Sequence, residues 1–310
     1  MSKETTLELV NDILAMVGGT QVNTIVGLTG GTLADIVLRR INRAIKRIAG
    51  KPEVDWYSLF KSRLFKTKGL TSSTLTITPG SPDEITDSAS GLGSFDPGAE
   101  LAISSAGNSQ YRFVIASVSS NTITLTSSSI VTGLSSGTSV TITQVSYPLA
   151  SDFRNSIDII DPVNNRVLKE RYTKSIDIER RWANNVTGDP DMFTIAGNFY
   201  RLSWVPTSDL VLLDRYIKTP DKRTLDAQTS DLPEFCDTSI YYLSYSDVLF
   251  FKKNLEQGAA EYNKFRAEIV AAEESNAKVM EIENAIEMNP EKTFGETRLS
   301  SGDILTVEEG

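Results

Sequence analysis

The chain has 310 residues, a formal charge of −9, a single cysteine and no histidine. The absence of histidine excludes histidine general acid–base catalysis, histidine metal ligation and every Ser-His or Cys-His nucleophile pair. One cysteine, Cys236, excludes an intrachain disulfide and fits assembly in a reducing compartment, and the acidic charge argues against a dedicated DNA-binding protein.

Motifs that carry catalysis are also missing from the sequence. It has no phosphate-binding G-x-x-x-x-G-K-[ST] loop, no H-E-x-x-H pair and no D-x-D-x-D-G calcium loop. A hydrolase that uses only carboxylates needs two of them held close together, and no acidic cluster here is distinctive. We therefore expect a protein that is not an enzyme and that binds no cofactor and no metal. No run of eighteen apolar residues and no signal-peptide core is present, so we expect no membrane contact.

Two amphipathic helices are expected at the N-terminal end. The first spans about residues 5–17 and stops at Gly18-Gly19. The second begins at Thr32, which fits an N-cap with Asp35 in a capping-box-like position. Its apolar positions follow a helical period, and its opposite face carries five cations: Arg39, Arg40, Arg43, Lys46 and Arg47.

That basic face has two interpretations. A solvated or subunit-pairing surface is favoured, because most helical charge runs are of this kind and no aromatic residues are interleaved with these cations. The alternative is contact with phosphate or with an acidic partner.

Residues 71–146 are poor in charge, rich in Ser, Thr and Gly, and typical of short β-strands. Alternating apolar residues mark strand candidates at 73–78, 99–104, 111–118, 121–126 and 139–145. Five or six strands in this length predict a small β-barrel or sandwich. Because the flanks are charged and helix-bounded, we expect an all-β domain inserted into a host domain formed by residues 1–70 and 147–288.

The host is expected to resume at Tyr147 with antiparallel strands, including a hairpin around Ala196-Gly197-Asn198. A strand follows from Leu210 to Tyr216. A helix then begins near Leu232-Pro233-Glu234, and Gly258 interrupts the helical run. The last long helix spans Ala259 to about Met288, where Asn289-Pro290 ends it. The predicted class is therefore α+β with long C-terminal helices.

The C-terminal helices supply the candidate subunit interface. The helix over 235–251 is aromatic on more than one side, so it needs cover on more than one side. Another subunit, or two long elements of the host, would provide that cover, and both readings remain open. The candidate interface residues are Tyr241, Tyr242, Tyr245, Phe250, Phe251, Phe265 and Ile269.

Residues 289–310 carry few large apolar groups and cannot form a core alone, so we expect an extended tail that a partner orders. Ile304, Leu305 and Val307 form a short strand-like segment within it, suited to adding to the sheet edge of another chain.

The order of the host elements resembles the head-to-tail adaptor proteins of short-tailed bacteriophages, which sit beneath the portal. The resemblance covers about residues 4–70 and 147–288. Its strongest local matches are Pro148 with Asp152-Phe153, the Trp204-Val205-Pro206 segment with Tyr216, and the helix entry at Leu232-Pro233-Glu234. The 71–146 insert departs from the simplest members of the family.

The resemblance implies a structural protein of the virion neck, assembled in the host cytoplasm as a homo-oligomeric ring of about twelve copies. One side of the ring binds the portal protein, to which the C-terminal tail docks, and the other side binds the tail nozzle or tail tube protein. Double-stranded DNA passes through the lumen without specific binding, during retention and ejection. An anionic lumen fits that passage, and the candidate channel carboxylates are Glu268, Glu273 and Glu274.

Two other classes remain open. One is a different neck or tail ring component, such as a nozzle or stopper, which direct assembly onto isolated portal distinguishes from an adaptor. The other is a virion protein whose Ser/Thr-rich insert binds host glycans, for which glycan binding by residues 71–146 is the discriminating observation.

Overall fold

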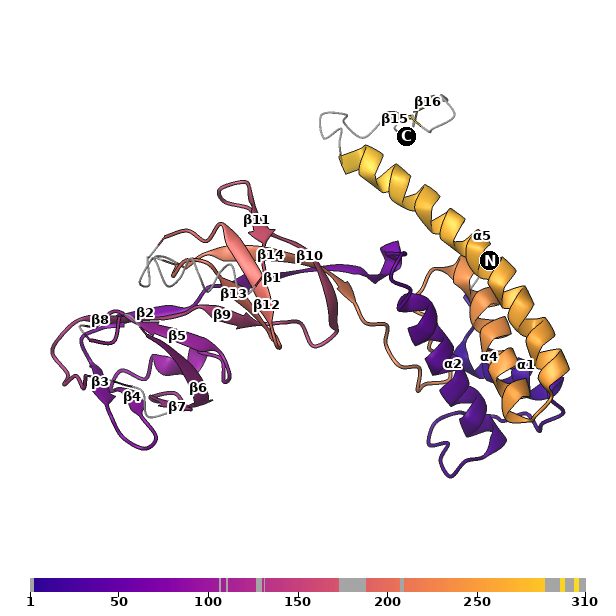
Figure 1. Cartoon of the computed structure of the whole chain (residues 1–310), viewed down its shortest axis with the longest axis horizontal. Helices are drawn as coiled ribbons and strands as arrows, with labels where there is room; N and C mark the ends of the chain where they lie inside the picture. The colour runs from indigo at the N-terminus through magenta and orange to yellow at the C-terminus, as the bar shows by residue number, and fades with distance from the viewer. Residues whose placement is uncertain are drawn as a thin grey trace. The chain divides into compact units, whose positions relative to one another are not determined.

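The computed structural model has a mixed α+β fold, as the sequence predicts (Figure 1). The structure describes residues 3–105, 107–109, 111–126, 130, 132–172, 188–206, 209–287, 296–298 and 304–306, with side chains as far as residue 281. Contacts group the chain into two units, residues 1–60 with 218–310 and residues 61–217. We call the first the helical unit and the second the β unit.

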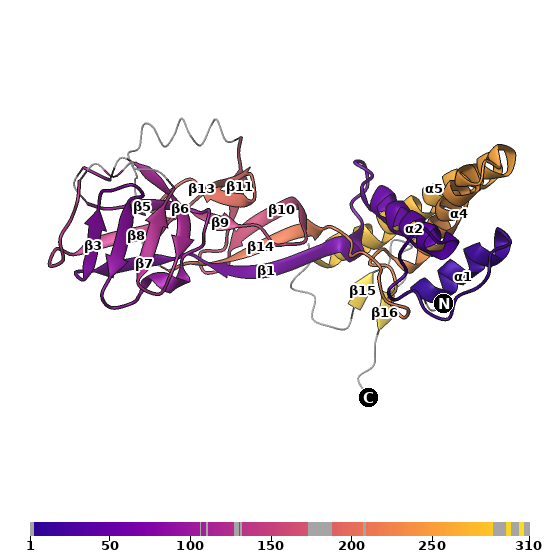
Figure 2. The same cartoon turned by 90° about the horizontal axis from the view of Figure 1, so that it is seen from below.

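The helical unit takes its elements from both ends of the chain. Its described helices are α1 (Thr6–Met16), α2 (Leu33–Ala49), α4 (Asp237–Phe251) and α5 (Leu255–Glu287). Thr5 caps α1 in a reciprocal capping box with Glu8, and the Thr32 side chain accepts a hydrogen bond from the Asp35 backbone at the start of α2. Both expected helix starts are thereby confirmed. α4 packs against both α2 and α5, as Figures 1 and 2 show.

The turn between α4 and α5 is close-packed. Gly258 is buried in the first turns of α5, where an added Cβ would lie 2.8 Å from the ring of Phe250. The expected helix start at Ala259 is wrong, because α5 begins at Leu255 and runs through the glycine. Contact with the Phe250 ring explains why glycine is accepted here despite a helix propensity about 1 kcal/mol poorer than that of alanine.

Buried polar contacts join the two halves of the helical unit. The Asn42 side chain on α2 accepts a hydrogen bond from the Arg223 backbone N–H at 2.7 Å and donates one to the Arg223 carbonyl at 3.0 Å. On α5, Asn276 accepts from the Tyr57 backbone N–H at 3.2 Å and donates to the Asp55 carbonyl at 2.9 Å. These bonds pair main-chain groups that burial would otherwise leave unsatisfied.

The first sheet of the β unit has the strand order β1-β14-β10-β11-β12-β13-β9. Its strands are β1 (Phe60–Lys66), β9 (Ser146–Pro148), β10 (Phe153–Asp161), β11 (Arg166–Glu170), β12 (Met192–Ala196), β13 (Phe199–Leu202) and β14 (Val211–Lys218). The predicted hairpin is confirmed: β12 and β13 pair antiparallel around Gly197, whose φ of 62° favours glycine.

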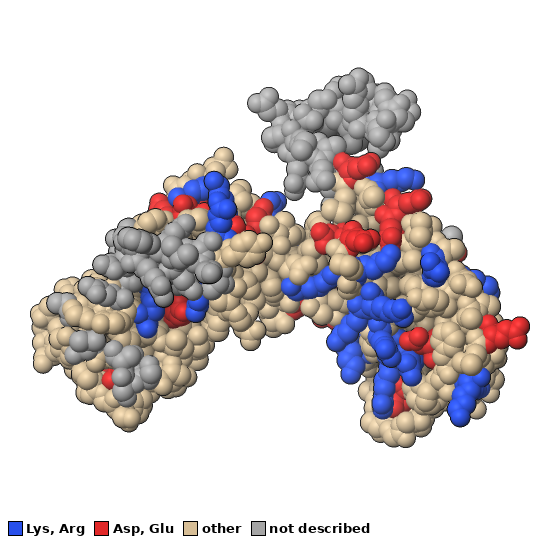
Figure 3. Space-filling view, in the orientation of Figure 1, with Lys and Arg blue, Asp and Glu red and all other residues tan. Residues whose placement is uncertain are grey.

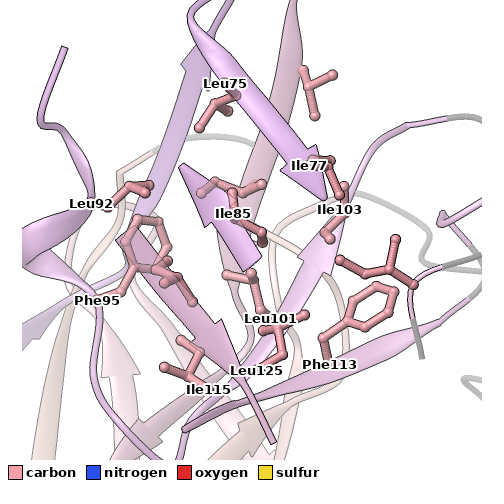
Figure 4. Packing of buried hydrophobic residues seen from close by; sticks show 14 of the residues in the cluster. Leu75, Ile77, Ile85, Leu92, Phe95, Leu101, Ile103, Phe113, Ile115 and Leu125 are labelled. Atoms are coloured by element: carbon pink, nitrogen blue, oxygen red, sulfur yellow. The ribbon is translucent and has the colours of Figure 1, made fainter. Parts of the chain in front are cut away.

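The second sheet has the order β2-β8-β5-β6-β7-β4-β3. Its strands are β2 (Gly69–Ser72), β3 (Leu75–Thr78), β4 (Glu84–Asp87), β5 (Glu100–Ile103), β6 (Arg112–Val118), β7 (Thr122–Leu125) and β8 (Val140–Gln144). Its two outermost strands, β2 and β3, are consecutive in the chain, so the sheet curls back on itself (Figure 2). Figure 4 shows the core that it surrounds, with Leu101, Phe113 and Ile85 among the fully buried side chains.

Two strands of this second sheet were not expected from the sequence. β4 has one large apolar residue, Ile85, and β2 has one, Leu70, so neither shows the alternation that identifies a strand. Both become strands because their backbones complete ladders with β3 and β7 or with β8.

The two sheets of the β unit are joined by main-chain and side-chain contacts. The Val145 N–H donates to the Glu100 carbonyl at 2.9 Å, and the Leu202 N–H donates to the Val145 carbonyl at 3.1 Å. Phe199 of β13 also packs against the core of the second sheet. The expected domain limits at residues 70 and 147 therefore lie inside the β unit, and the contact boundaries lie at 60 and 218.

Candidate functional site

Three of the candidate interface residues are buried within the helical unit. Tyr245 is 1% exposed, Phe265 is 8% exposed and Ile269 is 4% exposed. The Tyr245 hydroxyl accepts a hydrogen bond from Gln257 at 2.9 Å, and burial raises the pKa of this tyrosine. These three residues lie on α4 and α5, and α4 packs against α2 and α5 of the same chain, so part of the cover that α4 needs comes from within the chain.

The remaining aromatic candidates keep accessible surface. Tyr241 and Tyr242 are half-buried and stack edge to face, and burial raises the pKa of Tyr241 to about 12. Phe250 and Phe251 are 39% and 51% exposed at the end of α4, and Leu255 at the start of α5 is 67% exposed. These last three exposed apolar residues all lie between positions 250 and 255, at the α4–α5 turn, and we call them the turn edge.

A groove beside the turn edge combines cations with apolar surface. It is lined by Ile36, Arg39, Arg40, Arg43 and Phe251 and has a volume of about 310 Å³. We call it the arginine groove. Lys and Arg side chains gather over α2 in this part of the helical unit (Figure 3). Arg39 and Arg40 each lie about one turn before Arg43, which brings the three arginines to a common face of α2.

The three arginines differ in how far their charge is compensated. Arg39 forms a bidentate pair with Asp35, and its hydrogen bonds hold the pKa of that carboxyl below the ordinary value. The Arg40 guanidinium lies 3.9 Å from an Asp247 carboxylate oxygen and 5.9 Å from the centre of the Phe251 ring. Arg43 is exposed and has no ion-pair partner among the described residues.

Aromatic residues do accompany the basic face, which the sequence of α2 does not suggest. Phe251 contributes from α4, and Tyr262 contributes from α5. The Arg47 guanidinium lies 5.6 Å from the centre of the Tyr262 ring and donates a hydrogen bond to its hydroxyl at 3.1 Å. Sequence reasoning missed these partners, since it looked for aromatic residues within α2 itself.

The candidate channel carboxylates are not equivalent. Glu268 and Glu274 are exposed on α5, whereas Glu273 is half-buried and forms an ion pair with Lys51. The Glu268 and Glu274 carboxylates are therefore open to solvent, and the Glu273 charge is compensated within the chain.

The structure describes part of the predicted tail. β15 (Glu296–Arg298) and β16 (Ile304–Thr306) pair antiparallel, with Leu305 opposite Thr297. Ile304 and Leu305 thus lie on a short strand that pairs within its own chain. The expected addition to the sheet edge of another chain stays a prediction, and Val307 lies outside the described residues.

The carboxylate of Asp214 in the β unit has structural partners on several sides. It is fully buried, accepts hydrogen bonds from Arg63 Nε at 2.9 Å and from the Tyr200 hydroxyl at 2.8 Å, and burial raises its pKa. These partners satisfy a buried charge within the sheet, so we assign Asp214 a role in folding rather than in catalysis.

A small hydroxyl-rich pocket also lies in the β unit, with a volume of about 140 Å³. It is lined by Thr67, Lys68, Gly69, Thr71, Thr141, Thr143, Pro206 and Asp209. Across the described ranges, no three or more His, Cys, Asp or Glu side chains are grouped so as to hold a metal ion. No helix in the described part of the chain has both the length and the apolar character needed to cross a membrane.

Comparison with protein-family models and with curated proteins finds no match to this sequence. Any function given to the arginine groove and the turn edge therefore rests on the geometry of these two surfaces.

Proposed function

We propose that this chain is a structural subunit of the head-to-tail adaptor ring of a short-tailed bacteriophage. The observation that carries the proposal is the exposed turn edge beside the arginine groove. Aromatic residues and arginine are the residue types enriched at the centres of protein interfaces. Phe251 is half exposed at the point where the two surfaces meet, so the helical unit offers a binding surface to another protein.

The order of elements along the chain supports the choice of this family. The host segments that resemble adaptor proteins include α1 and α2 at one end and α4 and α5 at the other. In the proposed ring about twelve copies bind the portal on one side and the tail nozzle or tail tube on the other. A chain of net charge −9, with Glu268 and Glu274 exposed on α5, leaves DNA little to adhere to as it passes.

Electron microscopy of the purified chain mixed with isolated portal rings tests the proposal. We expect class averages with an added ring beneath the portal, and we expect loss of that ring on Phe251→Ala. Leu225→Ala is the matched control, because Leu225 is an apolar residue of the same unit that is at least as exposed as Phe251 and remote in sequence from the turn edge. A chain that leaves portal rings bare but binds an isolated nozzle or tail tube would refute the adaptor function and favour another tail component.

A further inference from the structure

The arginine groove is lined by two apolar side chains and by three arginines, whose guanidinium groups we call the rim. The chain itself compensates the positive charge of the rim only in part. Arg39 is paired with Asp35, and Arg40 is held near Asp247 and the Phe251 ring. Arg43 adds a full positive charge to the rim, with no ion-pair partner in the described part of the chain. The rim therefore retains the capacity to bind carboxylates from outside.

The chemistry of the groove favours an acidic polypeptide that also carries apolar side chains. Guanidinium groups bind carboxylates through paired hydrogen bonds. The half-exposed Phe251 ring and the side chain of Ile36 offer apolar contact, which a phosphate backbone does not use. A polypeptide therefore fits this surface better than DNA does.

A segment of this chain has that composition. Residues 289–310 contain five acidic and two basic residues, a formal charge of −3, whereas α2 contains five basic residues and one acidic residue, a formal charge of +4. The same segment carries apolar residues at intervals: Phe294, Leu299, Ile304, Leu305 and Val307.

The length of α5 argues that the segment comes from a second copy. α5 begins four residues after Phe251 and has 33 residues, so its rise of 1.5 Å per residue places Glu287 about 50 Å from the turn edge. Even fully extended, residues 289–310 would reach at most about 75 Å, and the antiparallel pairing of β15 with β16 shortens that reach. To fill the groove of its own copy the segment would have to run back along most of α5.

We infer that the acidic C-terminal segment, residues 289–310, of one copy binds the arginine groove of the next. The inference deepens the proposed function, on which it rests in assuming that several copies assemble side by side. Each copy gives a segment and receives one, which is a heterologous contact, the kind that builds a ring when its rotation closes.

Fluorescence anisotropy of a labelled synthetic peptide of residues 289–310, added to the dilute full-length chain, tests the inference. We expect saturable binding that weakens with salt, because exposed ion pairs are screened. Arg43→Glu should weaken binding at least tenfold, and the chain should keep its circular dichroism because Arg43 is exposed. Arg266→Glu, at an exposed arginine of α5, is the matched control and should leave binding unchanged.

A peptide of the same composition in scrambled order separates recognition from simple charge attraction. Equal binding of the scrambled peptide, no effect of Arg43→Glu, or displacement of the peptide by a short DNA duplex would overturn the inference. Binding of the peptide to portal rings but not to the chain would overturn it while leaving the adaptor function intact. Conversely, a chain that binds the peptide specifically but does not bind portal rings would support the inference. That result would refute only the proposed position of the ring beneath the portal.

Discussion

Substitutions at Tyr245 and Phe251 distinguish the contribution of the aromatic helix α4 to folding from its contribution to assembly. The side chain is 1% exposed, so Tyr245→Ala leaves a cavity in the helical unit that we expect to cost about 3–5 kcal/mol of unfolding free energy. Tyr245→Phe keeps the ring and loses only the hydrogen bond from Gln257, at about 0.5–1.5 kcal/mol. Phe251→Ala, at a half-exposed ring, should cost less than Tyr245→Ala because that ring is only partly removed from water.

Urea unfolding followed by circular dichroism at 222 nm measures these differences, because the described α-helices belong to the helical unit. We expect the largest fall in midpoint for Tyr245→Ala, a small fall for Tyr245→Phe and an intermediate or small one for Phe251→Ala. A Tyr245→Ala midpoint equal to that of the unsubstituted chain would refute the packing described for α4. A loss of portal binding by Tyr245→Ala therefore does not locate an interface, whereas the same loss by Phe251→Ala does.

Three further substitutions test other parts of the structure. Burial raises the pKa of Asp237 above its ordinary value of 3.8, so the native state binds more protons than the unfolded state in the window above that value, and stability falls as the pH rises through it. Asp237→Asn should make this pH-dependent loss of stability smaller, as measured by urea midpoints between about pH 4 and about pH 7. An unchanged dependence of the midpoint on pH would contradict the raised pKa of Asp237. Asn42→Ala removes both hydrogen bonds to the Arg223 backbone and should lower the unfolding free energy by about 2–4 kcal/mol in the same assay, whereas a loss below about 0.5 kcal/mol would show that the backbone finds other partners. Gly98 has a φ of 82°, and an added Cβ would lie 3.0 Å from the Phe199 ring. Gly98→Ala should therefore lower the unfolding free energy of the β unit by about 1–3 kcal/mol. Calorimetry would show this as a lower transition temperature, and an unshifted transition would argue against this contact.

Local signals in the sequence were sufficient for several elements. The predicted cap at Thr32 lies where α2 begins, because a capping side chain and its backbone partner are three residues apart and need no distant contact. Strands with alternating apolar residues, such as β3 and β7, are found where expected. β2 and β4 were missed because their pairing partners, and not their own side chains, make them strands.

The sequence by itself determined the mixed class, the cap at Thr32, the alternating strands and the basic face of α2. Tertiary structure alone decided which aromatic residues are buried, since an apolar pattern shows that a helix needs cover and does not show what covers it. It also decided that Phe251 of α4 and Tyr262 of α5 lie over arginines of α2. Such contacts join residues far apart in the chain, and only the packing of the helices sets the distance between them.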